Sequence, residues 1–317
     1  MRIHERELTA GITRTLEFEK KRLAEWAANC GIKRGHNCMY CSTSAMLRMH
    51  PAFKEKGENP FGIGYAIVDP STPDRLARDA RRRRKRGMVQ LCTTVDAWAP
   101  EAQRYQLGRQ CLEAILSEPG WTVRILTKNA AVRDDFGFIE RHRDRVLVGL
   151  SVTATPDTSN IMSILEPNAS SIRDRMSALR EAAACGLRTY AMFCPLLLGI
   201  ADTSDQIDRM VRFAVECDAE EIFVEPVNPR GPGLRMCQEA LKENGRRVEA
   251  AAIGRIRKRE HWSRYVADLV TNVQQSVRRL CDITKLRFLL YPSNLSPRDR
   301  RRIQGNDEGV IWLGRDS

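Results

Sequence analysis

Short apolar runs alternate with stretches of helical periodicity through the middle of the chain. The apolar runs predict strands over Met88 to Thr94, Trp121 to Leu126, Val146 to Val152, Leu187 to Cys194 and Glu221 to Glu225. Helical spacing and capping signals between them predict helices over Thr72 to Arg86, Glu101 to Ser117, Asn129 to His142, Ser170 to Ala184 and Thr203 to Glu216. The apolar residues of Lys21 to Asn29 predict a further strand, or a bend, ahead of this series.

This alternation predicts parallel βαβ units, because two parallel strands need a crossover that is usually a helix. Counting Lys21 to Asn29 as the first strand, the chain holds six such units. We therefore predict an α/β fold in the form of a partial TIM-type (β/α)6 barrel. In such a fold the functional groups lie at the carboxyl ends of the strands.

The two ends of the chain do not follow the alternation. Residues 1–20 are mixed and charged, and we interpret them as an N-terminal extension ahead of a partial barrel over residues 21–233. Residues 234–317 are interpreted as a basic, helical C-terminal extension. Its predicted elements are helices over Leu234 to Asn244 and His261 to Cys281 and a short strand over Leu286 to Leu290.

The composition fits a folded chain without a membrane segment. Of the 317 residues, 42% are hydrophobic, which is enough for a full core, and the length allows one or two domains. No run of eighteen apolar residues occurs, and the N-terminus lacks the apolar stretch of a secretion signal. We therefore expect a cytoplasmic protein with no membrane partner.

The formal net charge of +12 favours an anionic partner, of which nucleic acid is the usual one. Three basic stretches contribute to it: Arg81 to Arg86, Arg246 to Arg264, and Arg298 to Arg302. Trp262 and Tyr265 are interleaved with the second stretch, and aromatic rings among cations suit stacking on bases. The alternative interpretation is a basic enzyme whose cations form solvated faces.

Three cysteines, Cys30, Cys38 and Cys41, fall within twelve residues and end in a Cys-x-x-Cys pair. Thiolates are soft ligands, so this cluster suits iron–sulfur or zinc chemistry. Three thiolates hold three irons of a [4Fe–4S] cluster and leave the fourth iron open. A structural zinc ion needs four ligands, and His36 or a distant residue would have to be the fourth. A third interpretation is that the cysteines are small buried hydrophobes.

Polar residues follow the apolar strands and would meet at one edge of a parallel sheet. Cys92, Thr93 and Thr94 end the second strand, Lys128 follows the third, and Ser151 ends the fourth. We interpret them as the lining of one site, although strand ends are also polar simply because loops are.

The cysteine loop, with Tyr40 before its last cysteine, resembles the cluster loop of the radical S-adenosylmethionine (SAM) superfamily. It departs from the usual pattern, which has three residues between the first two cysteines, because seven separate Cys30 from Cys38. The rest of the chain is similar to spore photoproduct lyase-like proteins in four blocks. They are Leu126-Thr127-Lys128, Val148 to Thr153, Leu165 to Ser170 with Arg173, and Gly186-Leu187 leading to Cys194-Pro195, within a match from about Cys30 to Gly233.

The resemblance implies that Cys30, Cys38 and Cys41 hold a [4Fe–4S] cluster whose open iron binds SAM. It also implies roles for the remaining candidate residues. Cys92 would donate a hydrogen atom to a product radical, and the contacts of SAM would be Tyr40, Thr93, Lys128, Ser151 and Arg173.

The implied reaction is reductive cleavage of SAM to a 5′-deoxyadenosyl radical, which abstracts a hydrogen atom from the substrate. An electron donor such as flavodoxin or ferredoxin would supply the electron. The charge and the resemblance together favour a nucleic acid substrate, as in DNA repair. The alternatives are a small-molecule or peptide substrate, and a zinc-containing nucleic-acid-binding protein without radical chemistry.

Overall fold

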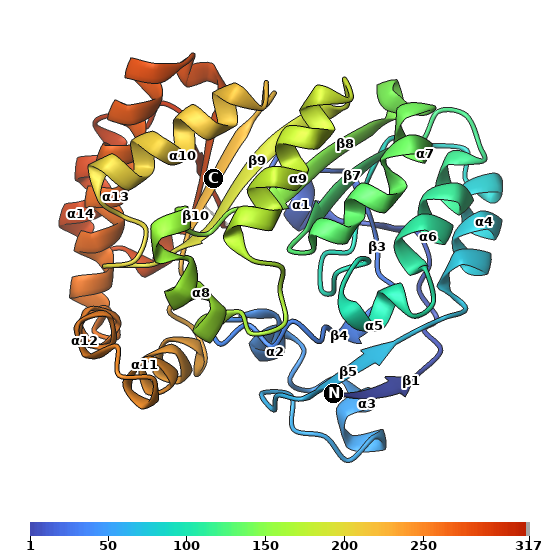
Figure 1. The fold of residues 1–317 in the computed structure, drawn as a ribbon, viewed down its shortest axis with the longest axis horizontal. Helices are drawn as coiled ribbons and strands as arrows, with labels where there is room; N and C mark the ends of the chain where they lie inside the picture. Colours follow the sequence, from blue (N-terminus) through green and yellow to red (C-terminus); the bar gives the residue numbers. More distant parts are fainter. Residues whose placement is uncertain (315–317) are drawn as a thin grey trace.

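The structure is a computed structural model that describes residues 1–314, and it is built around one large sheet (Figure 1). The nine strands of this sheet lie in the order β12-β11-β10-β9-β8-β7-β6-β3-β2. All are parallel to their neighbours except β2, which runs antiparallel to β3. Their bounds are β2 (Thr13–Arg14), β3 (Trp26–Ala28), β6 (Met88–Leu91), β7 (Thr122–Thr127), β8 (Val146–Ser151), β9 (Arg188–Leu196), β10 (Ile222–Pro226), β11 (Leu286–Leu290) and β12 (Val310–Trp312).

The six predicted strands are confirmed as β3, β6, β7, β8, β9 and β10, which are consecutive neighbours in the sheet. The predicted α/β class and partial barrel are also confirmed. In the described residues the sheet stays open, with β2 and β12 at its two edges. Strands β11 and β12, from the segment that we interpreted as a C-terminal extension, continue the same parallel sheet.

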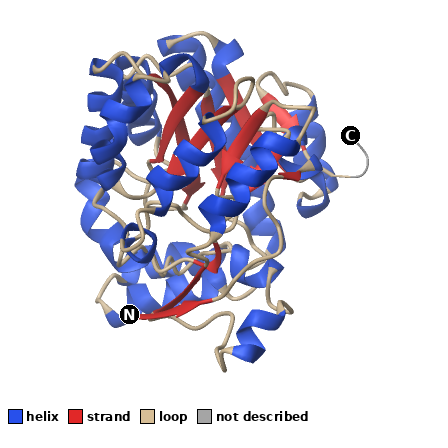
Figure 2. Cartoon of the chain, turned by 90° about the vertical axis from the view of Figure 1, so that its right-hand side faces the viewer, coloured by secondary structure: helices blue, strands red, loops and turns tan. Residues whose placement is uncertain are grey.

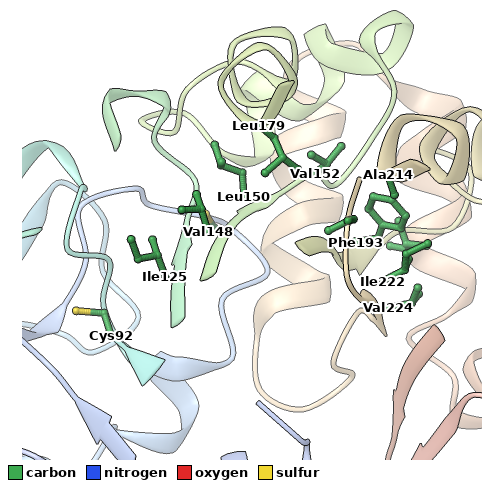
Figure 3. Close-up of a cluster of buried hydrophobic side chains, with 14 of the residues drawn as sticks. Cys92, Ile125, Val148, Leu150, Val152, Leu179, Phe193, Ala214, Ile222 and Val224 are labelled. Atoms are coloured by element: carbon green, nitrogen blue, oxygen red, sulfur yellow. The ribbon is translucent and has the colours of Figure 1, made fainter. Parts of the chain in front are cut away.

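Helices cover one face of the sheet, where the main core lies. They are α4 (Thr72–Arg82), α6 (Leu107–Leu116), α7 (Phe136–Glu140), α9 (Ile172–Ala184), α10 (Ser204–Glu216) and α13 (Arg259–Leu280). Figure 3 shows alternate strand residues such as Ile125, Val148 and Phe193 gathered with Leu179 of α9 and Ala214 of α10. Burying each large apolar side chain of this layer contributes roughly 1.5–3 kcal/mol.

The other face of the sheet carries a smaller apolar cluster, which includes Tyr190 and Phe223. The N-terminal segment that we interpreted as an extension lies against this cluster through Phe18, from α1 (Leu16–Lys20). The ammonium group of Lys21, just after α1, lies 3.8 Å from a carboxylate oxygen of Glu225 in β10. This segment therefore packs on the main sheet.

A second, three-stranded sheet lies beyond the carboxyl edge of the main sheet and holds the start of the cysteine loop (Figure 2). It consists of β1 (Arg2–Glu5), β5 (Tyr65–Val68) and β4 (Gly31–Lys33), which follows β3 after only two residues. A Cβ atom on Gly31 would lie 2.4 Å from the carbonyl oxygen of Ile67, so only glycine lets the two strands pair this closely. The small sheet thus fixes where the cysteine loop leaves β3.

Most of the remaining helices are short and lie around the same edge: α2 (Thr43–Met46), α3 (Pro51–Glu55), α5 (Pro100–Gln103), α8 (Ser159–Leu165), α11 (Gly233–Glu243) and α12 (Arg247–Arg255). Helix α14 (Pro297–Gln304) connects β11 to β12 and packs against α13. A Cβ atom on Gly233, at the start of α11, would lie 3.1 Å from the backbone of Tyr40. Among residues 1–314, the structure contains no helix with the length and apolarity needed to cross a membrane.

Candidate active site at the carboxyl edge of the sheet

The cysteine loop is anchored to the ends of the neighbouring strands. The Gly35 N–H group donates to the Glu101 carboxylate at 2.6 Å, and the Met39 N–H group donates to the Leu165 carbonyl at 2.9 Å. The His36 ring lies 2.7 Å from the Asp96 carboxylate through Nε2 and 3.1 Å from the Asn168 carbonyl through Nδ1. Because protein oxygens engage both ring nitrogens, His36 does not serve as the fourth ligand of a zinc site here.

Asp96 joins the loop to strands β6 and β7. Its carboxylate accepts hydrogen bonds from the Thr127 hydroxyl at 2.8 Å and from the Lys128 N–H group at 2.9 Å, besides the contact with His36. Burial disfavours the charged carboxylate, but these hydrogen bonds outweigh it and lower the pKa of Asp96. A buried anion therefore fixes the position of Lys128 relative to the loop.

Lys128 belongs to a buried charged group with Glu166, Arg175 and Tyr40. Its ammonium lies 2.8 Å from the Glu166 carboxylate and 2.9 Å from the Tyr40 hydroxyl. Arg175 and the Tyr40 hydroxyl also hydrogen-bond to Glu166. Burial opposes ionisation of Glu166, but the charges of Arg175 and Lys128 outweigh it and hold its pKa well below its usual range. The group carries two cations and one carboxylate, which leaves one positive charge in excess.

Cys38 and Cys41 line a narrow pocket beside this group. Lys33 and Arg34 also line the pocket, and the Arg34 guanidinium donates to the Cys41 thiol at 3.2 Å. Burial opposes ionisation of Cys41, but the charges of Arg34 and Lys33 prevail and lower its pKa to about 6. Burial, together with the charge of Glu166, raises the pKa of Cys38 to about 11.

Cys30 does not join the other two cysteines. Its thiol lies 3.4 Å from the thiol of Cys92, and the two residues are only 1% and 5% exposed. A hydrogen bond with Cys92 and burial raise the pKa of Cys30. Within residues 1–314, no group of three or more His, Cys, Asp or Glu side chains is arranged to hold a metal ion. The predicted ligand set is thus brought together only for Cys38 and Cys41.

The other predicted residues fall in different places. Thr93 lies at the same edge, where its hydroxyl accepts a hydrogen bond from the Asn29 amide at 3.0 Å. The Ser151 carbonyl accepts a hydrogen bond from Arg175 at 2.8 Å. Arg173 is exposed on α9 and lines a separate surface groove with Arg180.

Arg175 is the arginine that reaches the site, and sequence reasoning missed it. Two helical positions point about 200° apart, so residues 173 and 175 face opposite sides of α9. The buried residues Ile172, Met176 and Leu179 mark the inward face of α9, and position 175 falls on it. That apolar spacing was the signal in the sequence that distinguished the two arginines.

The expectation that aromatic rings in the second basic stretch stack on bases is wrong. Trp262 and Tyr265 are 2% and 6% exposed, and they donate hydrogen bonds to the carbonyls of Val227 and Leu196. These bonds place the start of α13 at the carboxyl ends of β9 and β10. The neighbouring cations are exposed beside this edge: Arg255, Arg257, Lys258 and Arg259.

Comparison with solved structures shows which known fold this chain has. A cysteine-to-serine mutant of spore photoproduct lyase superimposes with a TM-score of 0.53 and 16% sequence identity, over 76% of this chain. A tyrosine-to-phenylalanine mutant of the same enzyme gives a TM-score of 0.52.

The chain has the fold of spore photoproduct lyase, a radical SAM protein. It spans 66% of the spore photoproduct lyase chain. One spore photoproduct lyase structure, with a TM-score of 0.50, was solved in complex with dinucleoside spore photoproduct.

Sequence comparison adds one relative. The uncharacterized protein MJ0683 of Methanocaldococcus jannaschii is 23% identical over 179 residues, which are 56% of this chain and 63% of that protein. The chain thus spans less than two thirds of this curated relative. No family model matches the sequence.

Proposed function

We propose that this chain binds SAM and nucleic acid at the carboxyl edge of its sheet, on the fold that it shares with spore photoproduct lyase. The observation that carries the proposal is the buried group of Lys128, Glu166, Arg175 and Tyr40. It lies at the edge where parallel α/β folds keep their functional groups, beside two thiols in a pocket.

The excess positive charge of this group supports SAM as the cofactor, because SAM carries a carboxylate on its methionyl end. Lys128 is our candidate for that carboxylate, in a charge-assisted hydrogen bond. Thr93, Ser151 and Tyr40 remain proposed contacts of SAM at the same edge. Arg173, whose side chain is exposed on α9, remains only a sequence prediction, and Arg175 is the better candidate.

The radical reaction, in which SAM supplies a 5′-deoxyadenosyl radical, also requires a [4Fe–4S] cluster. As arranged, the predicted thiols do not fit three-thiolate ligation, because Cys30 faces Cys92 while Cys38 and Cys41 share the pocket. Ligation of a cluster by these three thiols is therefore not part of the proposed function. An electron donor and hydrogen donation by Cys92 remain predictions that depend on it.

The exposed cations at the carboxyl edge support a nucleic acid partner, because Lys and Arg neutralise phosphates. A solved relative in complex with a dinucleoside photoproduct supports the same class of ligand.

The test of cofactor binding is equilibrium dialysis of SAM against the wild-type chain and Lys128→Met. We expect Lys128→Met to weaken SAM binding about tenfold or more, because a hydrogen bond to a charged group contributes about 1.5–3 kcal/mol. Lys242→Met, at an exposed position on α11, is the matched control and should bind SAM normally. Circular dichroism checks that each variant is folded. Absence of SAM binding by the wild-type chain would reject the cofactor proposal.

A further inference from the structure

Residue 34 occupies the position of a cluster ligand in the usual radical SAM spacing. Counting back from Cys38 across three intervening residues gives Arg34, and Cys30 lies four residues earlier still. The chain thus has an arginine where the usual pattern has its first cysteine.

The guanidinium of Arg34 lies in the same pocket as the two thiols. It lines that pocket with Cys38 and Cys41, and it donates to the Cys41 thiol at 3.2 Å. A guanidinium is always charged in proteins, and it has five N–H donors but no acceptor lone pair. It therefore cannot ligate iron, although it lies beside the Cys41 thiol in this pocket.

Cys30 is held away from this pocket by its backbone. Its carbonyl accepts a hydrogen bond from the Asp69 N–H group at 2.9 Å, and Gly31 pairs with β5. Its thiol packs against Cys92 in the core and is not among the residues that line the pocket. The loop that carries Cys38 is anchored separately, through Glu101. Bringing Cys30 to the pocket would therefore require breaking contacts of the small sheet or of the loop.

We infer that Arg34 replaces the third thiolate, so that the wild-type chain has a dithiol beside a guanidinium instead of a three-cysteine cluster site. The inference rests on the proposed function, because it takes the pocket of Cys38 and Cys41 as the place of the cofactor. It follows that residue 34 determines whether this chain assembles a [4Fe–4S] cluster. SAM and nucleic acid binding, which depend on other residues, do not require that cluster.

The test is anaerobic reconstitution of the wild-type chain and of Arg34→Cys with iron and sulfide. Iron and acid-labile sulfide per chain and the electron paramagnetic resonance spectrum of the reduced protein are measured. We expect Arg34→Cys to gain a [4Fe–4S] cluster that the wild-type chain lacks. Arg48→Cys is the matched control, because it adds a cysteine at an exposed position outside the pocket and should gain no cluster.

Two results would overturn the inference. One is a full cluster in the wild-type chain that Cys30→Ala abolishes, because Cys30 would then be the third ligand. The other is a folded Arg34→Cys variant without a cluster. If Arg34→Cys does not fold, reconstitution of the wild-type chain and of Cys30→Ala alone still decides the question.

The same preparations separate this inference from the proposed function. Binding of SAM and of a single-stranded oligonucleotide is measured on each variant before reconstitution. If the folded wild-type chain binds neither SAM nor the oligonucleotide, the proposed function is rejected, whatever the iron content of Arg34→Cys. Normal binding together with a Cys30-dependent cluster in the wild-type chain would reject only the role of Arg34.

Discussion

Glu166 forms ion pairs with both Lys128 and Arg175 inside the site. Removing one partner of a buried ion pair is costly because the remaining charge is left without water or a counter-charge. The folded pKa of Glu166 is lowered, so its contribution to stability is complete above the usual glutamic acid pKa of about 4.3. That contribution is lost as the pH falls and the carboxylate becomes protonated in the folded chain.

Glu166→Gln should lower the free energy of unfolding by about 3–5 kcal/mol, because it leaves two buried cations without a carboxylate. Urea unfolding at pH 7 measures the change. Glu216→Gln is the control, because Glu216 pairs with Arg180 at an exposed position and should cost less than about 1 kcal/mol. Equal losses in the two variants would contradict the role that we give to Glu166.

At this scale the sequence predicts residue types better than it predicts contacts. Lys128 and Tyr40 were both candidates, and the structure joins them through a hydrogen bond of 2.9 Å. The contact of Cys30 with Cys92 was not predictable, because it depends on how β3 and β6 pair at residues far apart in sequence. The contact of Arg34 with Cys41 was not predicted either, because arginine is not a metal ligand and no motif in the sequence pairs it with a thiol.

The small sheet is the element that directs the cysteine loop, and Gly31 is the position where β4 approaches the backbone of β5 too closely for a side chain. Gly31→Ala should cost about 1–3 kcal/mol, because the added methyl group overlaps the Ile67 carbonyl and the backbone must shift. Thermal unfolding measures the effect. Gly137→Ala, at an exposed helical position with open space around it, is the control and should be neutral or stabilising. An unchanged melting temperature for Gly31→Ala would show that β4 tolerates displacement.

The six strands of the strand–helix alternation were predictable, whereas the strands of the small sheet were not. Each of the six barrel strands carries an apolar run that can be recognised in the sequence without knowing which strand pairs with it. Strands β1, β4 and β5 are as short as β3 and β6, but they lie outside the regular strand–helix alternation, and their pairing involves segments more than thirty residues apart. Strand β11 was predicted as a strand, but its place beside β10 follows from tertiary packing that no local pattern records.

The two edges of the sheet carry different basic clusters, and we expect the cluster near the site to bind nucleic acid. Arg255, Arg257, Lys258 and Arg259 lie at the carboxyl edge near the site, whereas Arg81 and its neighbours follow α4 on the way to the amino end of β6. The first cluster is therefore the one that lies near the proposed nucleic acid site. The position of each cluster in the fold thus indicates which of the two is expected to bind nucleic acid.

Replacing Arg255, Arg257, Lys258 and Arg259 by glutamine should weaken oligonucleotide binding and flatten its salt dependence. Each lost phosphate contact removes about 0.7 from the slope of log K against log salt for a single strand. Fluorescence anisotropy over a salt series measures both quantities. The control replaces Arg81, Arg82, Arg84 and Lys85, which are also exposed, and should leave the slope unchanged. The opposite pattern would move the nucleic acid to the amino edge.

The position of α1 against the last strands has a consequence for the order of folding. During synthesis the N-terminal residues emerge first. Yet Lys20 hydrogen-bonds to the Gly314 carbonyl, 294 residues away, and Lys21 pairs with Glu225. Helix α1 therefore completes its contacts only after residue 314 has been synthesised. Until the strands around Tyr190 and Phe223 form, Phe18 has no apolar surface to pack against, so we expect the N-terminal segment to stay solvent-exposed during most of synthesis.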